Sequence, residues 1–205
     1  MSIVEEIKDK IEYNGVIFER DILNLGYTKD DIENALEPNV FEEVENKWLP
    51  GKIYTFVEYS DFLDDYVRIR MTLYDIIRYY TGINQKYGML IGFCSLNEIG
   101  ASDQVCGSYE LKSILTSEKV VYKDDKTGCT ITVYPMDIEN YTSEISWYYL
   151  YADAFNNYLD YFDNSTKYVL SKLKRSGLIT NWCRLRDMVS NENIRGEIDE
   201  IITRE

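Results

Sequence analysis

The chain has 205 residues, of which 45% are hydrophobic and 14% aromatic, and it carries a net charge of −14. This length accommodates one domain of good size or two small ones, and the apolar content is ample for a packed core, which excludes a disordered chain. The sequence contains no histidine. Ser–His and Cys–His nucleophile pairs, HExxH metal sites and imidazole acid–base catalysis near neutral pH are therefore excluded.

Other patterns limit the cofactors and the compartment. The GxxxxGK[ST] and GxGxxG nucleotide-binding motifs are absent, and Cys94, Cys106, Cys129 and Cys183 are too widely spaced for a CxxC zinc knuckle. We expect no cofactor, no metal site and reduced, mostly buried thiols. The segment MSIVEEIKDK lacks the features of a signal or transit peptide, and no apolar stretch approaches the ~18 residues of a membrane span. We therefore expect a cytoplasmic protein without membrane contacts.

Helical spacing dominates the first part of the chain. Apolar residues three and four apart predict a first helix over residues 2–13. The segment VIFERDILNLG at 16–26 predicts a short β-branched stretch that leads into a second helix. Thr28 and Asp31 have the spacing of a capping box and predict a third helix that ends before Pro38.

Two strands are predicted to follow the third helix. NVFEEVENKW at 39–48 and KIYTFVEY at 52–59 are joined by LPG, whose Pro50 and Gly51 favour a turn. The order of helix, short strand, two helices and hairpin is typical of a winged helix-turn-helix. We assign it to residues 1–60.

Residues 61–205 are predicted to form a second domain of mixed α+β structure. A helix begins after Thr72, KVVY and CTITVYP flank a turn at 124–128 in the clearest hairpin, and a long amphipathic helix carries a stripe from Ile145 to Phe162. Two or three further helices complete the carboxyl end. The predicted fold class is therefore α+β, with an amino-terminal winged helix and a helical carboxyl end.

The segment YGMLIGFCSLNEIGASDQVCGSYEL at 87–111, placed after a winged-helix order, resembles the AbiEi-like antitoxin family of bacterial abortive-infection and type IV toxin–antitoxin systems. YADAFNNYLDYF at 151–162 is similar to a later helix of that family. The residues that match the family pattern in the first segment are Gly92, Ser95, Leu96, Asn97, Gly100, Ser102, Gln104 and Val105.

The resemblance implies a protein without enzymatic activity or catalytic residues. It implies an antitoxin that also represses its own operon, with a winged helix that binds operator DNA and a nucleotidyltransferase-like toxin as the genetic partner. The second domain would serve antitoxin action or assembly on DNA.

The charge of the winged-helix segment opposes that expectation. With 14 acidic and six basic residues, residues 1–60 carry a net charge of about −8, whereas a winged helix on DNA usually neutralises several phosphates. We identify an acidic interaction face on the third helix and the strand after it. Its residues are Asp30, Asp31, Glu33, Glu37, Glu42 and Glu43.

Three interpretations stay open for this surface. In the first, the protein is an antitoxin and regulator that contacts DNA through basic residues outside the third helix, both near the turn and in an acid-free segment at 172–186. A solvated helix face also explains that segment. In the second, the winged helix binds a protein target, such as the toxin. In the third, the acidic surface mimics nucleic acid and inhibits a defence or nucleic-acid enzyme, as a phage-borne inhibitor would. The candidate DNA contacts are Lys47, Lys52, Lys172, Lys174, Arg175, Arg184 and Arg186.

Overall fold

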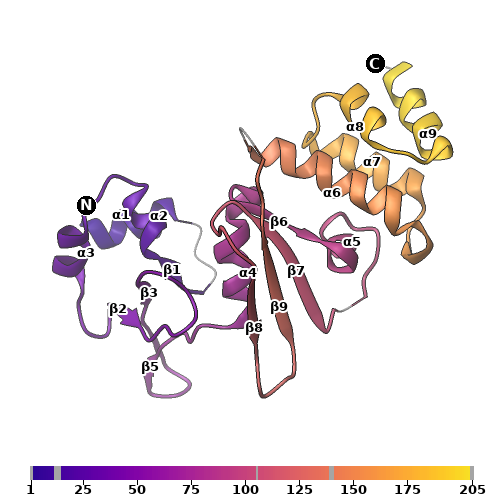
Figure 1. The fold of residues 1–205 in the computed structure, drawn as a ribbon. Helices are drawn as coiled ribbons and strands as arrows, with labels where there is room; N and C mark the ends of the chain where they lie inside the picture. The colour runs from indigo at the N-terminus through magenta and orange to yellow at the C-terminus, as the bar shows by residue number, and fades with distance from the viewer. Residues whose placement is uncertain (1, 12–14, 105, 139–140, 204–205) are drawn as a thin grey trace. The chain divides into compact units, whose positions relative to one another are not determined.

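A computed structural model describes residues 2–11, 15–104, 106–138 and 141–203 (Figure 1). The protein is a mixed α+β structure whose chain forms two compact units, Met1–Tyr79 and Tyr80–Glu205. The boundary between the units falls within helix α4 (Leu73–Thr81). The first unit extends beyond the range 1–60 that the sequence assigns to a winged helix, and that domain assignment stays a prediction.

Three helices and a three-stranded antiparallel sheet begin the first unit. The sheet has the order β1-β3-β2, so that β3 lies at its centre. The elements are α1 (Ile3–Lys10), β1 (Ile17–Phe18), α2 (Glu19–Leu23), α3 (Lys29–Ala35), β2 (Phe41–Val44) and β3 (Ile53–Phe56).

Local capping signals explain where these helices begin. The predicted capping box of α3 is confirmed: Thr28 Oγ1 accepts from the amide of Asp31, and the Asp31 carboxylate accepts from the amide of Thr28. Ser2 and Glu5 form the same arrangement on α1. Helix α1 ends at Lys10, earlier than predicted, and residues 12–14 lie outside the described residues.

The core of the first unit is formed by one apolar side of each helix packed on the sheet. Ile7 of α1, Ile22 of α2 and Ile32 of α3 are fully buried. They pack with apolar side chains of all three strands, namely Ile17, Phe41, Tyr54 and Phe56. Burial of this kind stabilises a side chain by about 1.5–3 kcal/mol, which is why the polar residues of α3 are left on its outer side.

A second hairpin follows β3 within the first unit. The predicted strand over 52–59 is divided by Val57, whose amide donates to the carbonyl of Val40 at 3.0 Å. The chain then forms β4 (Glu58–Ser60) and β5 (Asp65–Val67), which pair antiparallel as a separate two-stranded sheet. This hairpin was not predicted from the sequence.

The second unit contains a four-stranded sheet of order β6-β7-β9-β8. Its central pair, β7 and β9, is parallel, and the predicted hairpin around residues 124–128 is confirmed as the antiparallel pair β8 and β9. The strands are β6 (Gly88–Ile91), β7 (Ser108–Ser113), β8 (Val120–Lys123) and β9 (Thr130–Pro135).

Helices supply most of the core of the second unit, and Figure 1 shows α6 to α9 gathered together in orange and yellow. The long amphipathic helix is confirmed as α6, with Tyr148, Ala152 and Phe155 buried. It ends at Asn157, and a 3₁₀ turn follows it, so the predicted stripe does not run through one helix to Phe162. The helical elements are η1 (Ile83–Gln85), η2 (Gly92–Cys94), α5 (Ser95–Glu98), α6 (Ser143–Asn157), η3 (Leu159–Tyr161), α7 (Thr166–Ser176), α8 (Trp182–Met188) and α9 (Glu192–Thr203).

The cysteines differ from the sequence-based expectation of four reduced, mostly buried thiols. Cys94 and Cys106 form a disulfide that links η2 to the segment before β7. Of the free cysteines, Cys129 is half-buried and Cys183 is exposed. The expectation is wrong for the pair because the chain reverses direction between them, so residues twelve positions apart lie with their Cα atoms 5.9 Å from each other.

Candidate nucleic-acid interface and acidic face

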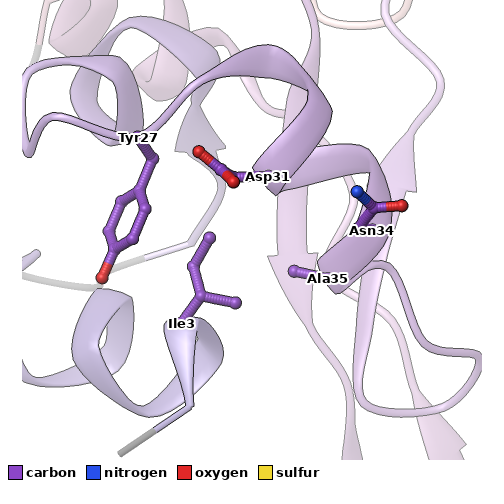
Figure 2. A pocket seen from close by; sticks show the side chains of 5 residues that line it. All are labelled: Ile3, Tyr27, Asp31, Asn34 and Ala35. Carbon is purple, nitrogen blue, oxygen red and sulfur yellow. The ribbon is translucent and has the colours of Figure 1, made fainter.

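The surface beside α3 contains a shallow open hollow of about 380 Å³. Figure 2 shows its lining, with Ile3 from α1 facing Asp31 and Ala35 from α3, and Tyr27 at the edge. The Tyr27 hydroxyl donates to the carboxylate of Glu6, and this hydrogen bond raises the pKa of Tyr27 to about 12. The lining presents a carboxylate and no cation, so the hollow is not suited to bind an anion.

The acidic face is exposed over α3. Asp30, Asp31 and Glu33 project from the helix, and Glu37 lies beyond its end, all of them exposed. Hydrogen bonds from the Thr28 hydroxyl and amide hold the pKa of Asp31 below its usual range, so this carboxylate is occupied as a helix cap. An acidic helix of this kind is unfavourable in the major groove, because the phosphates are negative on both sides of it.

Lys52, one of the residues predicted to contact DNA, is bound to the acidic face instead. Its ammonium group pairs with Glu33 of α3 and lies 3.0 Å from Glu43 of β2. Both carboxylates raise the pKa of Lys52. Lys29, the one cation of α3, lies 3.4 Å from Glu19. The positive charges nearest to α3 are thus matched by carboxylates of the protein itself.

A second open hollow, of about 560 Å³, lies beside the end of β2, and basic side chains contribute to its lining. Lys47, Arg68 and Arg70 line it together with Trp48, whose ring centroid is 5.2 Å from Lys47 Nζ. The carboxylates of Glu43 and Glu45 also line it. Cations beside an aromatic ring, here the half-buried indole of Trp48, are suited to contact phosphates and a base.

Of these residues, Lys47 was predicted from the sequence as a DNA contact, whereas Arg68, Arg70 and Trp48 were not. The sequence pattern that could have indicated the two arginines is VRIR at 67–70, because alternation places both of them on one side of an extended chain. We name this surface, formed by Lys47, Trp48, Arg68 and Arg70, the wing-side cluster.

The predicted basic segment at 172–186 is divided between two helices of the second unit. Lys172, Lys174 and Arg175 are exposed on α7. On α8, the Arg184 guanidinium lies 5.0 Å from the ring centroid of Tyr148. Arg186 donates to Asp187 at 2.9 Å and to Asp199 at 3.2 Å. Arg186 is therefore already matched by two carboxylates of the protein itself.

The residues that carry the family resemblance have structural partners within the second unit. Ser95 Oγ donates to the carbonyl of Gly92 at 2.6 Å, and Asn97 Nδ2 donates to the carbonyl of Gln104 at 2.6 Å. Ser102 Oγ donates to the Asp163 carboxylate at 2.6 Å.

These bonds fix the entry and exit of α5, and Leu96 is buried beneath them. Gly100 has φ +70, and a side chain there would collide with the end of Lys172. Val105 lies outside the described residues. The motif therefore forms a compact turn. The packing contacts of its described residues are sufficient to explain why these residue types occur there.

Comparison with protein-family models and with curated proteins gives no match to this chain. Over the described residues, no helix combines the length and apolar character needed to cross a bilayer.

Proposed function

We propose that the protein is a non-catalytic, antitoxin-like regulator of a toxin–antitoxin or phage-defence operon, and that its first part is a winged helix that contacts operator DNA. The observation that carries this proposal is the connection α1-β1-α2-α3-β2-β3 together with the sheet order β1-β3-β2. In a winged helix this arrangement presents a helix and the β2–β3 loop on one side. The proposal places the protein in the cytoplasm.

Under this proposal the wing side, rather than α3, supplies the main contacts to phosphate. Lys47 and Arg70 are exposed, and both line the hollow that Trp48 also lines. Each phosphate contact made by such a cation releases counterions and strengthens binding at low salt. Lys172, Lys174 and Arg175 form a second group of exposed cations, on α7 of the second unit. The carboxylates of α3 would be kept away from the duplex.

Fluorescence anisotropy with the DNA upstream of the gene and with an unrelated duplex tests this function. We expect tighter binding to the upstream DNA and a loss of affinity of about 10³-fold or less between about 50 and about 200 mM salt, since few cations are available. A reporter driven by the upstream DNA should be repressed when the protein is present. Equal affinity for both duplexes, or no binding at low salt, would contradict the regulator proposal.

A second candidate function is supported by the acidic face. Because Lys52 pairs with Glu33 of α3 and Glu43 of β2, these carboxylates are held at fixed positions on the surface. A fixed array of negative charge is complementary to a basic protein surface. The protein would then bind a toxin, or mimic nucleic acid and inhibit a defence or nucleic-acid enzyme.

Charge-neutralising variants separate this candidate from the first. The double variant Asp30→Asn/Glu37→Gln removes exposed charges that do not cap α3. We expect it to weaken binding to a basic protein target, with DNA binding unchanged or stronger. Unchanged affinity for such a target would remove the acidic face as its contact surface.

A further inference from the structure

We propose that the β4–β5 hairpin is a protein-docking element that inserts Phe62 and Leu63 into an apolar pocket rimmed by Lys and Arg on a partner protein. The inference rests on the second candidate function, because it assigns a contact surface and a chemistry to a protein partner. It does not depend on DNA binding.

Exposure of large apolar side chains is concentrated in this hairpin. Phe62 is 95% exposed and Leu63 is 60% exposed. Tyr59, Tyr66 and Val67 of the paired strands are exposed as well. A single exposed apolar residue is ordinary, but five within ten consecutive residues mark an interaction site.

The backbone of the hairpin directs its tip outward. The amide of Leu63 donates to the carbonyl of Ser60 at 3.1 Å, which closes a turn with Asp61 and Phe62 at its centre. Asp64 completes the reversal in the left-handed region, at φ +50. Phe62 therefore occupies the most distant point of the turn, as an inserting side chain requires.

Side-chain contacts order the hairpin before any partner binds. Tyr59 and Tyr66 are cross-strand neighbours, and their rings meet edge to face with centroids 5.3 Å apart. The Tyr59 hydroxyl donates to the Asp64 carboxylate. At the base, Arg68 donates to Glu42 of β2 at 2.8 Å. A preordered hairpin loses less conformational entropy on binding, so more of the contact energy appears as affinity.

The charges of the hairpin indicate the chemistry of the partner's surface. Carboxylates of Asp61, Asp64 and Asp65 lie in or beside the turn, Glu58 lies at the open end of the hairpin, and no Lys or Arg occurs between Lys52 and Arg68. This negative rim disfavours nucleic acid and anionic membrane surfaces, and it opposes the pairing of two copies of the hairpin. The complementary surface on the partner protein is an apolar pocket with a cationic rim. Phe62 would fill this pocket and contribute a large part of the binding energy.

Photocrosslinking of the full chain inside its host cells, followed by affinity measurement, tests the inference. The probe is the substitution Phe62→p-benzoylphenylalanine, and the matched control is the same substitution at Tyr74, which is 68% exposed on α4 of the same unit. We expect one crosslinked protein that is specific to position 62. Capture alone is not support, so that protein is then purified and its affinity for wild-type and variant chains is measured.

The affinities decide the outcome. We expect Phe62→Ser to weaken binding about tenfold or more, which corresponds to about 1.4 kcal/mol. We expect Glu58→Gln/Asp61→Asn to reduce the association rate and its salt dependence, and Tyr74→Ser to leave affinity unchanged. Since Phe62 is exposed, Phe62→Ser should keep the thermal midpoint of the wild type, which shows that the loss is not one of folding.

Several results would overturn the inference. These are crosslinks to lipid, to a second copy or within the chain only, the absence of any crosslink specific to position 62, and affinities that Phe62→Ser leaves unchanged. If the Asp30→Asn/Glu37→Gln variant weakens binding to that partner while Phe62→Ser does not, the acidic face is supported as the contact surface and the hairpin is excluded. If only Phe62→Ser lowers the affinity, the hairpin is supported as the contact surface and the acidic face is excluded.

Discussion

Arg68 holds Glu42 through two hydrogen bonds, from Nε to Oε2 at 2.8 Å and from Nη2 to Oε1 at 3.1 Å. The same guanidinium donates to Asn39 Oδ1 at 2.8 Å. The pair joins the segment after β5 to β2, and it matches one carboxylate of the acidic face with one cation of the wing-side cluster. A lysine cannot reproduce this planar, two-bonded contact.

We expect Arg68→Lys to lower the free energy of unfolding only slightly, because the pair is partly exposed and loses its fork geometry. A double-mutant cycle with Glu42→Gln, measured by urea denaturation, isolates the interaction. Additive effects of the two substitutions would show that the pair contributes nothing to stability.

We expect Thr28→Ala to lower the free energy of unfolding by about 1 kcal/mol, since the amide of Asp31 loses its acceptor at the start of α3. Thr28→Ser is the matched control, because a serine hydroxyl restores the cap. Thermal or urea denaturation followed by circular dichroism measures both. Equal stability of the alanine and serine variants would contradict the capping role.

The disulfide determines how many thiols react. In denaturant without a reductant, we expect a thiol reagent to label Cys129 and Cys183 and to leave Cys94 and Cys106 unlabelled. After reduction, all four should be labelled. Because the bond closes a short loop, Cys94→Ser/Cys106→Ser should lower the free energy of unfolding by about 2–3 kcal/mol. Labelling of four thiols before reduction would contradict the bond.

Acid sensitivity should depend in part on Glu144 at the start of α6. Its carboxylate accepts hydrogen bonds from the hydroxyls of Thr180 and Tyr148, and these bonds, with Thr180 the larger cause, lower its pKa. A lowered folded-state pKa gives stability that is present above the unfolded value, about 4.3, and is lost as the pH falls through the folded value.

We therefore expect Glu144→Gln to flatten the decline in stability below about pH 4.3. Denaturation midpoints measured from neutral pH down to about pH 3 test this expectation. An equally steep decline in the variant would assign the acid sensitivity to other carboxylates.

Local signals in the sequence predicted the parts of the fold that depend on neighbours in the chain. The capping box at Thr28, the hairpin of β8 and β9, and the apolar stripe of α6 are of this kind. The β4–β5 hairpin was missed because its turn, SDFLD, has neither glycine nor proline and uses Asp64 in the left-handed region. The parallel pairing of β7 with β9 joins distant segments, and no local pattern specifies it.

The candidate site was predictable in composition but not in geometry. The excess of acids on α3 was visible in the sequence. The pairing of Lys52 with Glu33 and Glu43, and of Arg186 with Asp199, brings together groups from different elements or loops. From the sequence alone, Lys52 and Arg186 were predicted to be available to DNA. Their partners follow from tertiary structure, which also places Arg68 and Arg70 beside Trp48.

The most direct measurement compares the salt dependence of binding to upstream DNA for wild type, Lys47→Gln, Arg70→Gln and Lys52→Gln. If DNA is contacted by the wing-side cluster, Lys47→Gln and Arg70→Gln should each weaken binding and reduce the slope of log affinity against log salt by about one, while Lys52→Gln should leave the slope unchanged. A slope that changes only with Lys52→Gln, or the absence of binding by the wild type, would contradict DNA regulation through this surface.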